Sequence, residues 1–126
     1  MKSYGRVLIV DDSTTSRMII ERCIQMAGVP VAEFLHAENG LDALSSLKAN
    51  RDVDLVVTDI NMPKMDGRTF ATLLRGDPAT ASIEVVIVSS IADSALESEL
   101  RSLGVSSVIK KPISPAKMLK ALGGES

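Results

Sequence analysis

The chain has 126 residues, of which 45% are hydrophobic, and a formal net charge of −2. This length is expected to give one domain over residues 1–126, with a core that folds without disulfides. The single cysteine, Cys23, excludes an intrachain disulfide and is typical of a reducing compartment. The weakly acidic balance and the 2% aromatic content argue against a nucleic-acid-binding protein, which needs a basic face or stacking rings. There is no signal region and no apolar run of membrane length, so we expect a cytoplasmic protein without a membrane partner.

Short apolar runs typical of buried strands alternate along the chain with patterns of helical spacing. In chain order, we expect strands at 6–10, 32–36, 55–59, 84–88 and 107–110, and helices at 14–27, from 39 or 40 to about 50, 68–75, 92–103 and 114–122. Ser13 is placed to cap the first helix, and Ser114 and Pro115 begin the last one. Five strands alternating with five helices predict an α/β fold, a single doubly wound (βα)5 domain whose parallel sheet is covered on both faces. Periodicity leaves the order of the strands open.

The apolar residues of each helix are expected to face the sheet. They are Met18, Ile19, Cys23, Ile24 and Ala27 in the first helix, Leu41, Leu44 and Leu47 in the second, Ala92, Ala95, Leu96, Leu100 and Leu103 in the fourth, and Met118, Leu119 and Leu122 in the fifth. Tyr4, before the first strand, is expected to be exposed. His36, the only histidine, is expected at the end of the second strand in a surface or hydrogen-bonded role.

Polar residues follow four of the expected strands where each one ends. They are Asp11 and Asp12 after the first strand, Asp59 after the third, Ser89 after the fourth and Lys111 after the fifth. Parallel strands end at one edge of their sheet, where open α/β folds bind ligands. We therefore expect three carboxylates, a hydroxyl and an ammonium group to converge there.

Crowded carboxylates repel one another unless a cation neutralises them. Mg²⁺ suits a site with few protein oxygens because it keeps several of its waters, whereas no histidine and cysteine pair with zinc spacing exists. Phosphoryl groups use a metal, an ammonium and a hydroxyl together, and an aspartate can act as a nucleophile toward them. The residues alone thus predict a Mg²⁺ site with phosphoryl chemistry.

The ordered motifs resemble the receiver domain of two-component response regulators, and the length matches a stand-alone CheY-like member. These motifs are Asp11-Asp12, Asp59 with Met62-Pro63, Asp66-Gly67, Ser89 and Lys111-Pro112. The resemblance covers nearly the whole chain. It implies a five-stranded parallel sheet in the flavodoxin-like and CheY-like order 2-1-3-4-5.

The resemblance also implies a role for each site residue. Asp59 would accept a phosphoryl group from a histidine kinase or a small phosphodonor. Mg²⁺ would be held by Asp11, Asp12, Asp59 and the backbone carbonyl of Asn61. Lys111 would pair with the phosphoryl oxygens, and the Lys111-Pro112 bond would be cis. Ser89 would move to hydrogen-bond the phosphoryl group. Beyond this self-catalysed acceptance and slow loss of the phosphoryl group, the resemblance does not imply an enzyme.

A downstream protein is expected to recognise the phosphorylated state by binding a surface formed by the fourth helix, the fifth strand and the fifth helix. Phosphorylation adds about −1.5 to −2 charges and would bias this surface between two existing arrangements. The target could belong to chemotaxis or to another phosphorelay. The protein could be a monomer or a phosphorylation-dependent dimer.

Two positions depart from the family pattern. Many receivers have an aromatic switch residue three positions before the lysine, where this chain has Val108. Ile91 stands two residues after Ser89, where the family often has a polar residue that orients water, so we expect slow self-hydrolysis of the phosphoryl group.

Two other function classes compete with a phosphorylated switch. An aspartate-nucleophile phosphatase would need a second aspartate where Asn61 stands, and a cap domain for which the chain has no room. A pseudo-receiver that binds partners without phosphorylation would have no use for the complete set of carboxylates.

Overall fold

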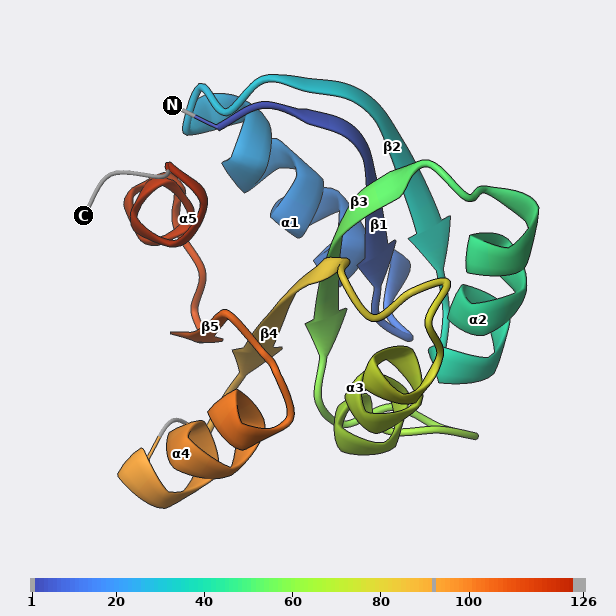
Figure 1. Cartoon of the computed structure of the whole chain (residues 1–126). Helices are drawn as coiled ribbons and strands as arrows, with labels where there is room; N and C mark the ends of the chain where they lie inside the picture. Colours follow the sequence, from blue (N-terminus) through green and yellow to red (C-terminus); the bar gives the residue numbers. More distant parts are fainter. Residues whose placement is uncertain (1, 92, 124–126) are drawn as a thin grey trace.

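A computed structural model describes residues 2–91 and 93–123 of the chain (Figure 1). Its strands are β1 (Tyr4–Val10), β2 (Val31–Ala37), β3 (Val53–Asp59), β4 (Glu84–Ser89) and β5 (Ser107–Lys110). Its helices are α1 (Thr14–Met26), α2 (Gly40–Ala49), α3 (Gly67–Gly76), α4 (Ser94–Ser102) and α5 (Pro115–Leu122). The strands form one parallel sheet in the order β2-β1-β3-β4-β5. The predicted α/β fold and strand order are confirmed.

The core lies in two layers, one on each face of the sheet. On one face, β1, β3 and β4 pack against α1 and α5; on the other, they pack against α2, α3 and α4. Residues 55–57 of β3 are fully buried, since helices cover the strand on both sides. The third strand therefore runs through the centre of the molecule, and Asp59 is the residue at which it leaves the core.

Each helix begins with a side chain that caps its first turn. The capping residues are Ser13, Asn39, Asp66, Asp93 and Ser114, and each accepts a hydrogen bond from a backbone N–H three residues later. In a βα unit the helix begins just after the carboxyl end of a strand. The caps consequently fix the loops at the edge of the sheet where the polar residues were predicted to meet.

Several predicted exposures are wrong. Tyr4 is buried, at 7% exposed, because its hydroxyl donates to Glu84 Oε1 (3.0 Å) while its ring joins the core under α1 and α5. Burial and the Glu84 carboxylate raise the pKa of Tyr4 well above its ordinary value. Met18 and Ile19 are 62% and 49% exposed, since the buried stripe of α1 consists of residues 17, 20, 23 and 24.

Leu41 of α2 and Leu119 of α5 are likewise exposed, because each of these short helices buries a narrow stripe. Cys23 is buried as expected, and burial raises the pKa of its thiol. The prediction that Ala92 faces inward lies outside the described residues.

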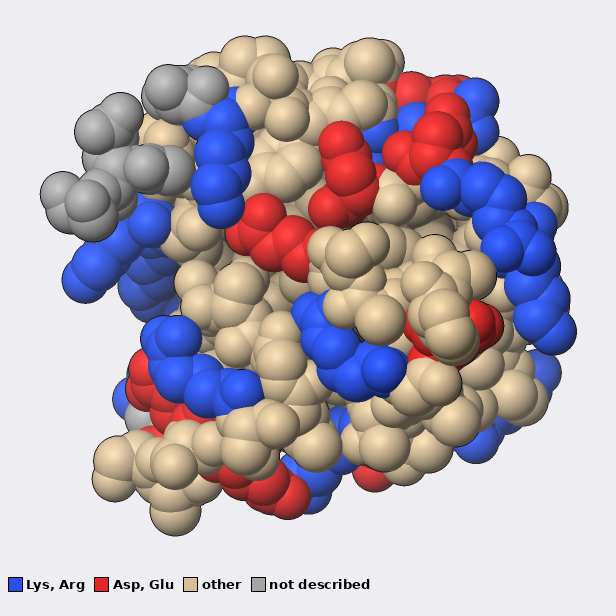
Figure 2. Space-filling model, in the orientation of Figure 1, with Lys and Arg blue, Asp and Glu red and all other residues tan. Residues whose placement is uncertain are grey.

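On the face seen in Figure 2, basic and acidic side chains are interspersed, without a continuous basic surface.

Candidate functional site

Asp59 is the last residue of β3 and is buried at the carboxyl edge of the sheet. Its side chain is largely buried, and its Oδ1 accepts a hydrogen bond from the backbone N–H of Ile60 (2.8 Å). Its Oδ2 lies 3.3 Å from Lys111 Nζ. One oxygen is thus held by the backbone and the other by an ammonium group, so the carboxylate has a fixed orientation.

Asp11 and Asp12 bring two further carboxylates to Asp59. One oxygen from each of the three side chains lies within 4.8 Å of the others. Asp11 is 1% exposed, and its Oδ1 accepts from the backbone N–H of Ser13 (2.9 Å). Its Oδ2 is buried and has no hydrogen-bond partner among the residues that the structure describes.

Burial raises the pKa of the Asp11 carboxyl above its ordinary value, and the nearby carboxylates of Asp59 and Asp12 act in the same direction. The N–H of Ser13 and the ammonium of Lys111 lower this pKa and only partly offset the rise. A buried charged oxygen without a partner is costly, whereas a hard cation bound by three carboxylates would remove that cost. The residues present therefore fit a Mg²⁺ site.

The ends of the fourth and fifth strands bring Ser89 and Lys111 to the same edge of the sheet. The backbone N–H of Lys111 donates to the carbonyl of Ser89 (2.8 Å), so the ends of β4 and β5 lie side by side. The side chain of Ser89 is buried, and its Oγ accepts from the N–H of Ile91 (3.1 Å). The Lys111-Pro112 peptide bond is cis, as the resemblance implied.

Residues 7–123 match the model of the response regulator receiver domain. The chain belongs to this family. Its members are not classical enzymes, in agreement with the prediction. The chemotaxis protein CheY1 of Helicobacter pylori is 32% identical over 117 residues, which is 93% of both chains. A CheY homolog of Campylobacter jejuni is 31% identical, over 93% of this chain and 88% of its own.

Solved structures of similar proteins share the fold closely. Chemotaxis response regulator CheY4 of Vibrio cholerae superposes with a TM-score of 0.81 at 27% identity, covering 96% of this chain and 98% of that one. CheY in the CheX-CheY-BeF3-Mg complex of Borrelia burgdorferi gives a TM-score of 0.80 at 27% identity, covering 93% and 85%.

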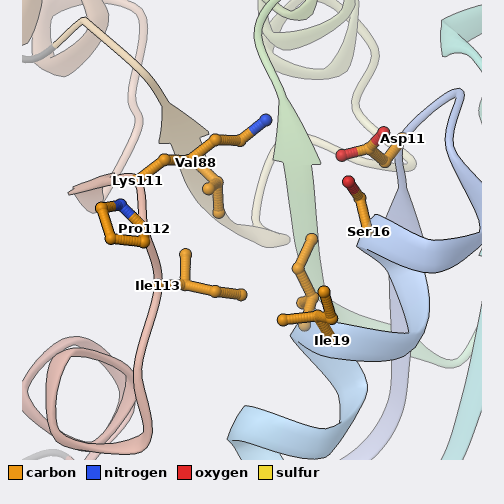
Figure 3. A pocket seen from close by; sticks show the side chains of 8 residues that line it. Asp11, Ser16, Ile19, Val88, Lys111, Pro112 and Ile113 are labelled. Atoms are coloured by element: carbon orange, nitrogen blue, oxygen red, sulfur yellow. The ribbon is translucent and has the colours of Figure 1, made fainter.

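An apolar groove of about 460 Å³ opens beside the acidic pocket of this receiver domain (Figure 3). Lys111 and Asp11 point toward one another at one end of the groove. Its walls come from α1, through Ile19 and Ile20, and from the segment after β5, through Pro112 and Ile113. The groove between α1 and the segment after β5 therefore adjoins the acidic pocket at Asp11 and Lys111.

Three features of the receiver site were not predicted from the sequence. Gly67 N–H donates to the carbonyl of Ile60 (2.8 Å), and a Cβ on Gly67 would lie 2.7 Å from the Asp59 carbonyl oxygen. Lys117 Nζ donates to two carbonyls that flank Lys111, those of residues 110 (3.0 Å) and 112 (2.7 Å). Neither the Gly67 contact nor the Lys117 hydrogen bonds produce a periodic pattern in the sequence, so hydropathy could not predict them.

The third feature is Arg17, which is buried and donates to the backbone carbonyl of Asp11 (2.6 Å). Its position in the stripe of residues 17, 20 and 24 on α1 could have revealed it, since this is the helical spacing of the buried face. His36 has the hydrogen-bonded role that was expected of it, with Arg17 and Glu21 as its partners. Asn61 is exposed in the loop after β3, and metal binding by its carbonyl stays a prediction.

Proposed function

We propose that this chain is a single-domain response regulator that accepts a phosphoryl group on Asp59 from a histidine kinase, with Mg²⁺ as its cofactor. The observation that carries the proposal is the Asp59 carboxylate, which lies within 4.8 Å of the oxygens of Asp11 and Asp12 and 3.3 Å from Lys111 Nζ. Family membership supports the kinase as the donor. The acidic triad supports the metal.

In the proposed reaction, an Asp59 oxygen attacks the phosphorus of the donor phosphohistidine. The new O–P bond forms as the N–P bond breaks, and the imidazole nitrogen leaves with the bonding electron pair. Lys111 offsets the charge of the transferring oxygens. Mg²⁺ bound by Asp11, Asp12, Asp59 and the carbonyl of Asn61 would supply the further positive charge that three carboxylates and a phosphoryl group require.

The conformational change that follows phosphorylation would begin at Ser89. Its hydroxyl can turn from the N–H of Ile91 toward a phosphoryl group on Asp59, since Asp59 and Ser89 end neighbouring strands. This turn would pull on the segment that leads into α4. We propose that a downstream protein reads the change on the surface of α4, β5 and α5. Val108 on β5 is half-buried and replaces the aromatic switch, so the coupling would pass mainly through α4.

The pathway we propose is chemotaxis, acting in the cytoplasm. The support is that relatives matching 93% of the chain are chemotaxis proteins. A place in another phosphorelay would use the same site. Of the helices in the described ranges, none has the length and apolarity needed to span a membrane.

The test is phosphorylation with acetyl phosphate, compared between Asp59→Asn and Asp66→Asn. Both variants make the same chemical change, but Asp66 caps α3 through Thr69 N–H, and asparagine caps helices equally well. We expect Mg²⁺-dependent labelling of the wild type and of Asp66→Asn, and none of Asp59→Asn. Labelling that persists in Asp59→Asn would overturn the assignment, and a wild type that is never labelled would favour the pseudo-receiver.

A further inference from the structure

A buried arginine next to the acidic pair takes no part in the phosphoryl chemistry described above. Arg17 of α1 is 7% exposed, and its guanidinium makes three hydrogen bonds to the protein. Nη1 donates to the backbone carbonyl of Asp11 (2.6 Å), and Nη2 donates to Thr14 Oγ1 (3.1 Å). Burial of a permanently charged side chain is rare without such partners.

The carbonyl that Arg17 contacts belongs to the planar peptide unit that joins Asp11 to Asp12. The orientation of this unit determines where both carboxylates branch from the chain. On the other side of Asp11, its N–H donates to the carbonyl of Ala37 (3.1 Å), which ties the residue to β2. Arg17 thus holds the side of Asp11 that leads into Asp12.

His36 holds the guanidinium in turn. Arg17 Nε donates to His36 Nδ1 (3.2 Å), so Nδ1 is an acceptor and the ring proton lies on Nε2. Nε2 then donates to Glu21 Oε1, 2.7 Å away. Both ring nitrogens are used, and a continuous series of hydrogen bonds runs from Glu21 at the surface to the Asp11 carbonyl inside.

We propose that Arg17 and His36 are positioning residues for the cation site: Arg17 fixes the peptide unit between Asp11 and Asp12, and His36 fixes Arg17. This inference rests on the proposed function, because it takes Asp11 and Asp12 as Mg²⁺ ligands. Groups that orient metal ligands from behind change metal affinity by about 10- to 100-fold when they are removed. His36 would therefore affect a site that it does not touch.

The first test is calorimetric titration of the unphosphorylated full chain with Mg²⁺, comparing His36→Leu with His36→Asn. Asparagine can place an acceptor oxygen near the position of Nδ1, whereas leucine offers none. We expect a Kd about tenfold higher for His36→Leu and a Kd close to wild type for His36→Asn. About a third of the His36 side chain is exposed at the edge of the sheet, so both variants are expected to fold, which circular dichroism checks.

The second test asks whether His36 acts through Arg17. Arg17→Lys keeps the positive charge but loses the planar fork that reaches three acceptors. We expect it to weaken Mg²⁺ binding as His36→Leu does, and the double variant to be no weaker than Arg17→Lys alone. Arg6→Lys is the matched control, since Arg6 pairs with Glu33 and Asp52 at the opposite end of β1.

The outcomes separate this inference from the proposed function. Wild-type affinity in His36→Leu, equal losses in the leucine and asparagine variants, or additive losses in the double variant would overturn the positioning role alone. A wild type that does not bind Mg²⁺ would contradict the proposed function and the positioning role with it. Three results together would support the positioning role of Arg17 and His36. These are weaker Mg²⁺ binding in His36→Leu, Mg²⁺ affinity close to wild type in His36→Asn, and no further loss of affinity when His36→Leu is added to Arg17→Lys.

Discussion

Replacing Asp11 by asparagine is expected to stabilise the protein when Mg²⁺ is absent. The buried Oδ2 of Asp11 has no partner within the described part of the chain, and the carboxylates of Asp12 and Asp59 lie close by. A buried polar atom without a partner costs about 1–3 kcal/mol, and repulsion between like charges adds to this. Asparagine removes the charge, keeps an oxygen for the N–H of Ser13, and replaces the unpartnered oxygen by an amide N–H donor that faces the carboxylates of Asp12 and Asp59. We expect the free energy of unfolding to rise by about 1–2 kcal/mol.

When Mg²⁺ is present, the wild type should instead be more stable than the Asp11→Asn variant. A ligand at 100 times its Kd adds about 2.7 kcal/mol to the free energy of unfolding of the wild type. The Asp11→Asn variant lacks one of three carboxylates and should gain much less. The measurement is denaturant unfolding followed by circular dichroism, with Mg²⁺ and with a chelator.

Asp52→Asn provides a control with the same change of charge. Asp52 is exposed and pairs with Arg6 at the other end of the sheet, so this variant should gain no stability without Mg²⁺ and should respond fully to it. An Asp11→Asn variant less stable than wild type in chelator would refute the reasoning. A wild type whose unfolding does not respond to Mg²⁺ would refute it as well.

Three further predictions concern the same pocket. Gly67→Ala places a Cβ 2.7 Å from the Asp59 carbonyl oxygen and 2.9 Å from Ile60 Cα, so it should cost about 1–3 kcal/mol of stability by denaturant unfolding and slow labelling by acetyl phosphate. Because the pKa of Asp11 is raised in the folded state, the native protein binds this proton more tightly than the unfolded chain does. In chelator, the free energy of unfolding should therefore fall as pH rises from the ordinary carboxyl value through the raised pKa, and this fall should vanish in Asp11→Asn. Ile91→Glu should shorten the half-life of the phosphoryl group, since a carboxylate beside Ser89 can orient water, and an unchanged half-life would count against that role.

The meeting of Asp11, Asp12, Asp59 and Lys111 could be predicted from the sequence because it depends on where the strands end. In parallel strands, the residue after each buried run is placed at one edge, so the order of residues along the chain is enough to group Asp11, Asp59, Ser89 and Lys111. Helix caps could also be predicted from the sequence, since the Ser13 side chain accepts a hydrogen bond from the first turn of its own helix, at the N–H of Ser16. Local chemistry of this kind needs no knowledge of the strand order.

Which residues of each helix face the sheet could not be predicted from the sequence with the same accuracy. Met18 and Ile19 fit the apolar pattern of α1, but the sheet covers only the neighbouring stripe, and hydropathy does not say which apolar residue lies at its border. The contacts of Lys117 with backbone carbonyls depend on the path of the segment after β5. Likewise, the pairing of Arg17 with His36 depends on β2 lying next to β1, and that order came from the family resemblance.

A crystal structure of the protein with Mg²⁺ and beryllium fluoride, a mimic of the phosphoryl group, would show whether Asp59 carries the phosphoryl group beside a Mg²⁺ site. We expect beryllium on an Asp59 oxygen, its fluorides near Lys111 and Ser89, and Mg²⁺ on Asp11, Asp12 and Asp59. Beryllium fluoride bound to another carboxylate, or Mg²⁺ bound away from these aspartates, would contradict it.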